Sequence, residues 1–219
     1  MKNVVISWSS GKDSTLTLER LLESNDYRVV GLFTTYLDQS VPFQGTPISV
    51  VQAQAAAIGL PLILIPLNET FPPNDIYQST IVTALRASRL PIEAVAFGDM
   101  YCNGIADYRK SYIEPQSWEC VLPLLGEDSQ LLAQEIIDRG IKTRLMTVDS
   151  TQLNPEFCGR EYNNVLLAEL PSVVDPCGED GEFHTLVTDA PCFNYPLLIN
   201  LDEKENDGRF FYQRYKHIA

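Results

Sequence analysis

The chain has 219 residues, of which 45% are hydrophobic and 21% charged, which is enough for one large domain or two small ones with an apolar core. Its formal net charge of −13 argues against sequence-independent binding to RNA or DNA. The longest apolar run, residues 58–67, contains two prolines and is too short to span a membrane. The first residues do not resemble a signal peptide, so we expect a cytoplasmic protein without a membrane segment.

Apolar strands and amphipathic helices alternate over the first half of the chain. The patterns predict strands at residues 2–8, 28–35, 61–66 and 93–97, and helices at 12–23, 47–57 and 75–88. This order is typical of a doubly wound parallel sheet with helices on both faces. We therefore expect a Rossmann-like α/β fold.

A smaller α+β region is expected to begin at residue 118, which divides the chain into domains 1–117 and 118–219. Its predicted elements are a strand at 119–122, a helix at 129–139, a strand at 143–148, a helix near 160–170 and a final loop-and-strand segment. Residues 203–219 mix charged and aromatic side chains. Two interpretations are open for them, a packed tail or a contact with a partner.

The segment Ser-Ser-Gly-Lys-Asp-Ser lies between the first predicted strand and the helix that follows it. It consists of Ser9, Ser10, Gly11, Lys12, Asp13 and Ser14. Unpaired backbone N–H groups at such a turn, with the positive end of the helix dipole behind them, favour the binding of phosphate. The spacing fits neither a Walker A loop nor a GxGxxG loop. The alternative is a serine N-cap before an ordinary helix.

Gly98 and Asp99 follow the fourth predicted strand. In a doubly wound sheet the first and fourth strands become neighbours, and their carboxyl ends flank the ligand crevice. Asp99 would then face the phosphate loop and could hold Mg²⁺ on ATP phosphates, and Asp13 is the second metal candidate. The alternatives are a simple turn at Asp99 and stabilisation of the helix dipole by Asp13.

Residues 175–193 form a glycine-rich acidic loop that runs into an alternating strand. Glu179, Asp180, Glu182 and His184 lie within six residues. The glycines permit tight turns, and Glu182 and His184 share a face if the strand has already begun. Such groups could bind ammonium or an amine, orient a substrate, or transfer a proton near neutral pH. The alternative is a solvated acidic turn with one incidental histidine.

Together these motifs resemble the diphthine–ammonia ligase family, a branch of the N-type ATP pyrophosphatases. Residues 9–14 are similar to an SGGxDS loop, and residues 178–185 to a GENGEFHT-like signature. Other family-like stretches follow in the same order: ISVVQAQAAAIGLPL, FGD at 97–99, PLLGED at 123–128, VDS at 148–150 and FCGREY at 157–162. Two sites depart from the family pattern. Ser10 replaces the first glycine, and Phe43-Gln44-Gly45 stands where members often carry Met-His-Gly.

The resemblance implies an AMP-forming ligase that uses ATP and Mg²⁺ to adenylate a carboxylate, on a small molecule or a modified protein side chain, and amidates it with ammonia. It implies ATP at residues 9–14 and Gly98 in the first domain, and catalysis by Lys12, Asp13, Glu182 and His184. The implied substrate side, mainly in the second domain, consists of Asp99, Gly159, Arg160, Gly178, Glu179, Gly181, Glu182, His184 and Thr185. Rival hypotheses are a related enzyme that adenylates another substrate such as RNA, and a non-catalytic ATP-binding protein. A homo-oligomer is left open.

Overall fold

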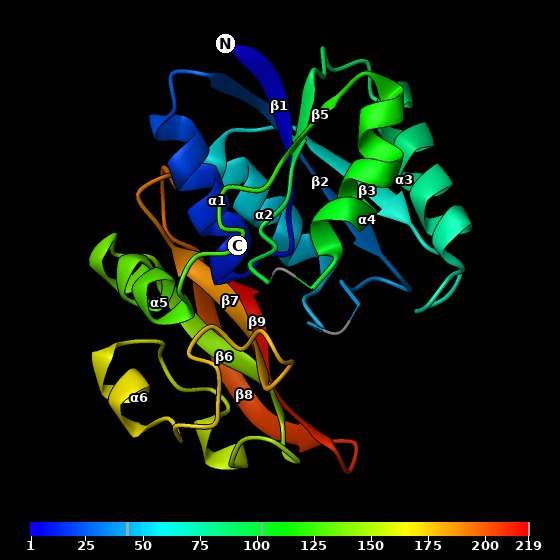
Figure 1. Ribbon diagram of the computed structural model, residues 1–219. Helices are drawn as coiled ribbons and strands as arrows, with labels where there is room; N and C mark the ends of the chain where they lie inside the picture. Colours follow the sequence, from blue (N-terminus) through cyan, green and yellow to red (C-terminus); the bar gives the residue numbers. More distant parts are fainter. Residues whose placement is uncertain (43, 102, 219) are drawn as a thin grey trace.

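Two β-sheets organise the computed structural model, which describes residues 1–42, 44–101 and 103–218 (Figure 1). The strands are β1 (Lys2–Ser7), β2 (Tyr27–Tyr36), β3 (Leu62–Pro66), β4 (Ala94–Ala96), β5 (Glu119–Val121), β6 (Lys142–Asp149), β7 (Phe183–Asp189), β8 (Leu198–Asn206) and β9 (Phe210–Ile218). The α-helices are α1 (Lys12–Glu23), α2 (Ile48–Ile58), α3 (Asn74–Ala87), α4 (Ile105–Ile113), α5 (Ser129–Asp138) and α6 (Asn164–Glu169), with short 3-10 helices at Glu114–Gln116 and Pro155–Phe157. None of the helices in these ranges is long and apolar enough to cross a membrane.

The first sheet is parallel and has the strand order β3-β2-β1-β4-β5. The order reverses between β1 and β4, as the doubly wound α/β prediction requires, so the carboxyl ends of these two strands flank a crevice. The strand at 119–122 was wrongly assigned to the second region. It is β5, and it pairs with β4 because so short a strand needs a neighbouring ladder to satisfy its backbone groups.

Helices cover both faces of the first sheet because β1 alternates its buried side chains. Val4 and Ile6 belong to a core with residues of α1 and α2, whereas Val5 belongs to a second core with α3 and α4. The first core continues into α5, β6 and β7. Helices α1 and α2 therefore lie between the two sheets, as Figure 1 shows.

The second sheet has the order β7-β6-β9-β8, and its pairings are antiparallel. Residues 203–219 were left open between a tail and a partner contact. In the structure, the described residues of this segment lie mainly in the hairpin of β8 and β9, and β9 pairs with β6. The helix predicted at 160–170 is shorter, because Leu145 and Thr143 of β6 bond to the backbone of Arg160 and Tyr162. Asn163 then caps α6 at the N–H of Leu166, at 3.0 Å.

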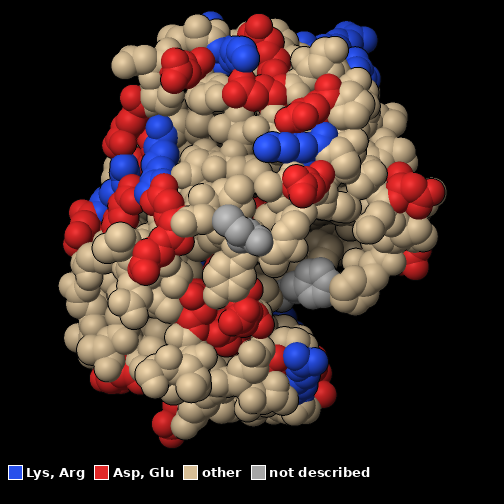
Figure 2. Space-filling model, in the orientation of Figure 1, with Lys and Arg blue, Asp and Glu red and all other residues tan. Residues whose placement is uncertain are grey.

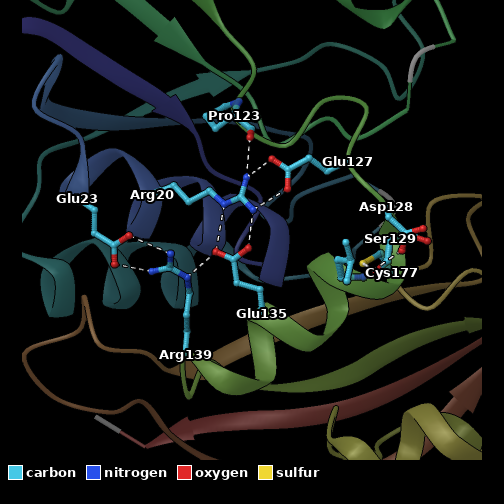
Figure 3. Close-up of polar contacts among 10 residues, drawn as sticks. Arg20, Glu23, Pro123, Glu127, Asp128, Ser129, Glu135, Arg139 and Cys177 are labelled. Carbon is cyan, nitrogen blue, oxygen red and sulfur yellow. Dashed lines mark hydrogen bonds and ion pairs between the residues drawn. The ribbon is translucent and has the colours of Figure 1, made fainter.

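Ion pairs connect α1 to α5 and to the segment before it (Figure 3). The Arg20 guanidinium contacts the carboxylates of Glu127 and Glu135 and donates to the carbonyl of Pro123 at 2.9 Å. Arg139 contacts Glu135 as well, and it donates to both oxygens of Glu23 at 2.7 and 2.9 Å. The network fixes the helix that begins at the phosphate loop against the second region of the chain.

Candidate active site

The phosphate loop is held between α2 and β7. The carbonyl of Ser10 accepts hydrogen bonds from the Gln54 side chain at 3.2 Å and from the N–H of Val187 at 3.0 Å. The Thr185 hydroxyl accepts the N–H of Lys12 at 3.2 Å. A Cβ at Gly11 would lie 3.1 Å from that hydroxyl, so glycine permits the close approach of β7. Thr185, assigned to the substrate side from the sequence, contacts the phosphate loop in the structure.

Gly98 lies directly against the start of α1. A Cβ at this position would come within 3.0 Å of the carbonyl carbon and oxygen of Asp13 and within 3.2 Å of the backbone nitrogen of Ser14. These atoms are backbone and cannot rotate away. The end of β4 and the phosphate loop therefore meet, as the predicted strand order requires.

Lys12 and Asp13 form a buried ion pair at the first turn of α1. The Lys12 ammonium lies 2.8 and 2.9 Å from the two Asp13 carboxylate oxygens, and the Lys12 residue is only 2% exposed. Burial has the largest single effect and lowers the pKa of Lys12. The charge and hydrogen bond of Asp13, together with the nearby Cys177 and Glu179, outweigh the effect of burial, and the pKa is raised overall. Lys12 thus keeps a positive charge at the phosphate loop at neutral pH.

Several carboxylates lie near this pair. Burial, with the charges of Asp13, Asp175 and Asp99 added to it, raises the pKa of Glu179 to about 7, although Lys12 opposes the change. Burial and then Asp175 raise the pKa of Tyr101. Figure 2 shows acidic side chains gathered near the middle of this face, over the loop from α6 to β7. The site therefore combines one buried cation with a group of carboxylates.

Glu182 shapes the loop that carries Glu179. The Glu182 side chain is buried, and its two oxygens accept the N–H of Asp175 at 2.8 Å and the N–H of Asp180 at 3.0 Å. Because β7 begins at Phe183, Glu182 lies in the turn before the strand, so the alternation argument that placed Glu182 and His184 on one face does not apply. The catalytic role of Glu182 stays a prediction.

His184 is the first titratable side chain of β7. Burial, with a smaller effect of Lys12, lowers the pKa of His184 to about 4. The imidazole is therefore neutral at physiological pH and is a weak base, so it is suited to hydrogen bonding rather than to proton transfer near pH 7. Its catalytic role also stays a prediction.

The glycines of this loop differ in what surrounds them. Gly178 and Gly181 both have left-handed backbones, with φ of +74° and +83°. At Gly178 a Cβ would also come within 2.9 Å of the Phe183 carbonyl oxygen, whereas at Gly181 it would meet open space. The predicted tight turns are present, and Gly178 additionally allows the loop to pack on β7.

Three other predicted residues are engaged by partners of their own. Both oxygens of Asp99 accept from the Arg109 guanidinium, at 2.8 and 3.2 Å. Arg160 pairs with Glu169 of α6 at 2.7 Å. Gly159 has a φ of +84°, and a Cβ there would lie 2.5 Å from the Gln213 side-chain oxygen of β9. Gly159 and Arg160 thus have structural contacts with β9 and α6, and their roles in binding a substrate stay predictions.

A metal ion would have to share its ligands with bound phosphates. Among the described residues, no group of three or more His, Cys, Asp or Glu could hold a metal. Mg²⁺ bound to a nucleotide needs only one or two carboxylates in addition to phosphate oxygens. Asp13 faces Lys12 and Asp99 faces Arg109, so the metal roles of both stay predictions.

Sequence reasoning missed Gln54 and Arg109. Gln54 lies on α2 and is completely buried, and Arg109 lies on α4 and binds Asp99. The signal for Gln54 in the sequence is weak, because it is a polar residue in an Ala-, Val- and Ile-rich helix but shares that helix with Ser49 and the exposed Gln52. Arg109 shows no comparable signal, since its contact joins two elements only in the folded chain.

The doubly wound sheet, with its loop at the β1–α1 turn and charged side chains beside it, defines a Rossmann-like nucleotide-binding class of protein. A family model described as the diphthamide synthase N-terminal domain matches residues 1–120, and one for the diphthamide synthase C-terminal domain matches residues 128–218. The chain belongs to the diphthamide synthase family, the same family that the motifs indicated, and it is an ATP-using enzyme of that family.

Several solved structures are similar at low sequence identity. A predicted subunit of tRNA methyltransferase from Methanocaldococcus jannaschii has 14% identity and a TM-score of 0.48, covering 86% of this chain and 98% of that one. The U34-tRNA thiolase NcsA from Methanococcus maripaludis has 17% identity and a TM-score of 0.41, covering 63% and 56%. Phosphoribosylglycinamide formyltransferase from Brucella melitensis has 18% identity and a TM-score of 0.33, covering 65% and 68%. These scores carry no inference about function. No curated protein sequence matches the chain.

Proposed function

We propose that the protein is an AMP-forming ligase that converts a carboxylate into an amide, as a diphthine–ammonia ligase does. A carboxylate oxygen of the substrate attacks the α-phosphorus of ATP, and the bond from that phosphorus to the bridging oxygen breaks and releases pyrophosphate. Ammonia then attacks the acyl carbon, and AMP leaves with its bonding electron pair. The observation that carries the proposal is that the loop before α1, the buried Lys12 and the carboxylates of Asp13 and Glu179 lie together at the carboxyl end of the first sheet.

Helix α1 and the loop before it would bind the phosphates of ATP and stabilise the leaving pyrophosphate. Pyrophosphate gains negative charge as it leaves, and the Lys12 ammonium and the positive end of the α1 dipole would stabilise it there. Mg²⁺ carried by ATP would neutralise further phosphate charge, with Asp13 or Asp99 as its protein ligand. Positioning and charge stabilisation then suffice without a covalent enzyme intermediate.

The carboxylates near the loop would bind ammonium and accept its proton. Ammonium is a cation, and Asp175 and Glu179 provide negative charge next to the loop. Ammonium must lose a proton before it attacks, and an acceptor is most effective when its pKa lies near the working pH. Glu179 has a pKa of about 7 and therefore suits this role. Free ammonia is the proposed nitrogen source.

The substrate is a carboxylate on a small molecule or on a modified protein side chain. A related enzyme that adenylates RNA is the first rival, and it would need a basic surface that a chain of net charge −13 does not favour. A non-catalytic ATP-binding protein is the second rival. It has no need for a proton acceptor beside the phosphate loop, which is the reason to prefer the ligase.

The test is ATP turnover with Mg²⁺, ammonium and a pool of candidate carboxylates, with AMP and pyrophosphate followed separately from ADP and phosphate. We expect carboxylate-dependent AMP and pyrophosphate from the wild type, lost in Asp13→Asn and retained in Glu203→Gln, an exposed control on β8. Production of ADP would contradict the proposal. ATP binding without turnover would favour the binding protein, and a salt-sensitive gel shift of tRNA would favour the RNA enzyme.

A further inference from the structure

Gln54 of α2 connects three parts of the chain around the phosphate loop. The Gln54 side chain is completely buried, and both the oxygen and the nitrogen of its amide group are hydrogen-bonded. Its oxygen accepts from the indole N–H of Trp8 at 2.9 Å, and its nitrogen donates to the carbonyls of Ser10 at 3.2 Å and Val187 at 2.7 Å. The end of β1, the loop and β7 thus meet at one side chain.

The residue that Gln54 holds has an unfavourable backbone conformation. Ser10 has a φ of +68°, in the left-handed region where a Cβ clashes with the backbone and glycine is preferred. Such a conformation persists only where the surroundings fix it. Ser10 is fully buried, and its carbonyl receives two hydrogen bonds, one from Gln54 and one from the Val187 N–H. Gln54 also binds the Val187 carbonyl, so its amide locks Ser10 and β7 to each other.

We propose that Gln54 is a positioning residue of the phosphate loop. By holding the Ser10 carbonyl it keeps Ser10 left-handed, and this conformation sets where the chain enters α1 at Lys12. The requirement follows from the serine side chain, because glycine would adopt the same backbone conformation without external support. The inference rests on the proposed function only in taking the ligand of the loop to be ATP.

If Gln54 only filled space, a variant of the same volume without the hydrogen bonds would bind ATP as the wild type does. A buried amide costs free energy unless it is hydrogen-bonded, so an unbranched apolar side chain of similar volume would keep the packing and lose only the hydrogen bonds. Gln54→Met is this variant. Gln54→Glu is its complement, because it keeps an acceptor for Trp8 and leaves at most one O–H donor where the amide offers two N–H donors to Ser10 and Val187. Gln52→Met is the matched control, since Gln52 is exposed on the same helix.

The experiment measures Mg·ATP affinity by calorimetry and backbone hydrogen exchange without nucleotide. We expect Gln54→Met and Gln54→Glu to weaken ATP binding about tenfold and to speed exchange of the Val187 amide, which bonds to Ser10, by a similar factor. Gln52→Met should change neither quantity. Thermal unfolding identifies any variant that does not fold. The other Gln54 variant then tests whether the hydrogen bonds of Gln54 are needed for ATP binding.

Coupling to Ser10→Gly separates positioning from general stability. If Gln54 acts by holding Ser10 left-handed, Gln54→Met should weaken ATP binding at least threefold less in the Ser10→Gly background than in the wild type. Equal losses in both backgrounds, or normal ATP affinity and Val187 exchange in the Gln54 variants, would overturn the inference. A wild type that binds ATP but forms no AMP would refute the proposed function alone. ATP affinity and exchange of the Val187 amide would still test the role of Gln54. A wild type that binds no ATP would overturn both.

Discussion

Replacing Glu179 with glutamine tests the electrostatics of the site, because the two side chains have nearly the same shape and only one of them ionises. Burial, and next to it the charge of Asp13, raises the pKa of Glu179 from 4.5 to about 7. Each pKa unit between the folded and unfolded states is worth about 1.4 kcal/mol, which gives an upper limit of about 3.4 kcal/mol for the cost of ionising Glu179 in the fold. Part of the side chain is exposed, so we expect about 2 kcal/mol.

The sign of this effect follows from proton binding. Below pH 4.5 the carboxyl group of Glu179 is protonated in both states and costs nothing. As the pH rises from 4.5 to about 7, the unfolded chain releases the proton first, so the free energy of unfolding falls and then levels off. The Glu179→Gln variant does not ionise and should exceed the wild type by about 2 kcal/mol at pH 8.5, and by under about 0.5 kcal/mol at pH 4.5.

Urea unfolding at these two pH values, followed by the fluorescence of the buried Trp8 and Trp118, measures the difference. Glu203→Gln, on the exposed strand β8, is the control and should leave the free energy of unfolding unchanged at both. A gain in Glu179→Gln that is equal at both pH values would refute the reasoning, because it would show that ionisation of Glu179 carries no cost. The same variant should lose amide formation if Glu179 accepts the proton from ammonium.

Three other substitutions test the packing around the site, with urea unfolding as the common measurement. Gly98→Ala should cost about 1–3 kcal/mol and weaken ATP binding, because its Cβ meets the backbone of Asp13; unchanged ATP affinity would contradict this close contact. Arg20→Ala should cost about 1–2 kcal/mol through the α1–α5 network, whereas Arg214→Ala, in an exposed pair with Glu205, should cost under about 0.5 kcal/mol; equal losses would rule out a special role for the network. Gly178→Ala should cost about 2 kcal/mol or more, from its left-handed backbone and the contact with Phe183, and a neutral result would exclude this loop conformation.

The sequence predicted the first sheet better than the second for a physical reason. Strands buried on both faces, such as β1, are continuous apolar runs that are visible without a partner. Strand β8 is exposed along nearly its whole length, and its charged residues carry no such pattern, so the hairpin with β9 follows only from backbone pairing. The start of α6 was misplaced for a similar reason, because Arg160 and Tyr162 bond to β6.

The candidate site shows the same division. The position of Gly98 followed from strand order alone, since any doubly wound sheet brings the ends of the first and fourth strands together. Gln54 bonds to groups at the end of β1, in the phosphate loop and in β7, which are distant in the sequence, and no spacing in the sequence encodes these contacts. Glu182 bonds within its own loop, but only the folded backbone aims the N–H groups of Asp175 and Asp180 at it. Sequence reasoning therefore located the crevice but did not distinguish the side chains that build it from those that face a ligand.

Charges of opposite sign at the site come from different regions of the chain, and each suits a different reactant of the proposed ligase. Lys12 stays cationic because Asp13 lies against it, and the α1 dipole points its positive end the same way. Asp175 and Glu179 come from the second region of the chain and lie near this pair, because the charge of Asp175 raises the pKa of Glu179 and that of Lys12 lowers it. Phosphates would therefore be attracted to Lys12 and the start of α1, and an ammonium ion to the carboxylates of the second region. Holding ATP and ammonia close together in one site favours the attack of ammonia on the acyl-adenylate over its loss to water, because proximity lowers the entropic cost of the second step.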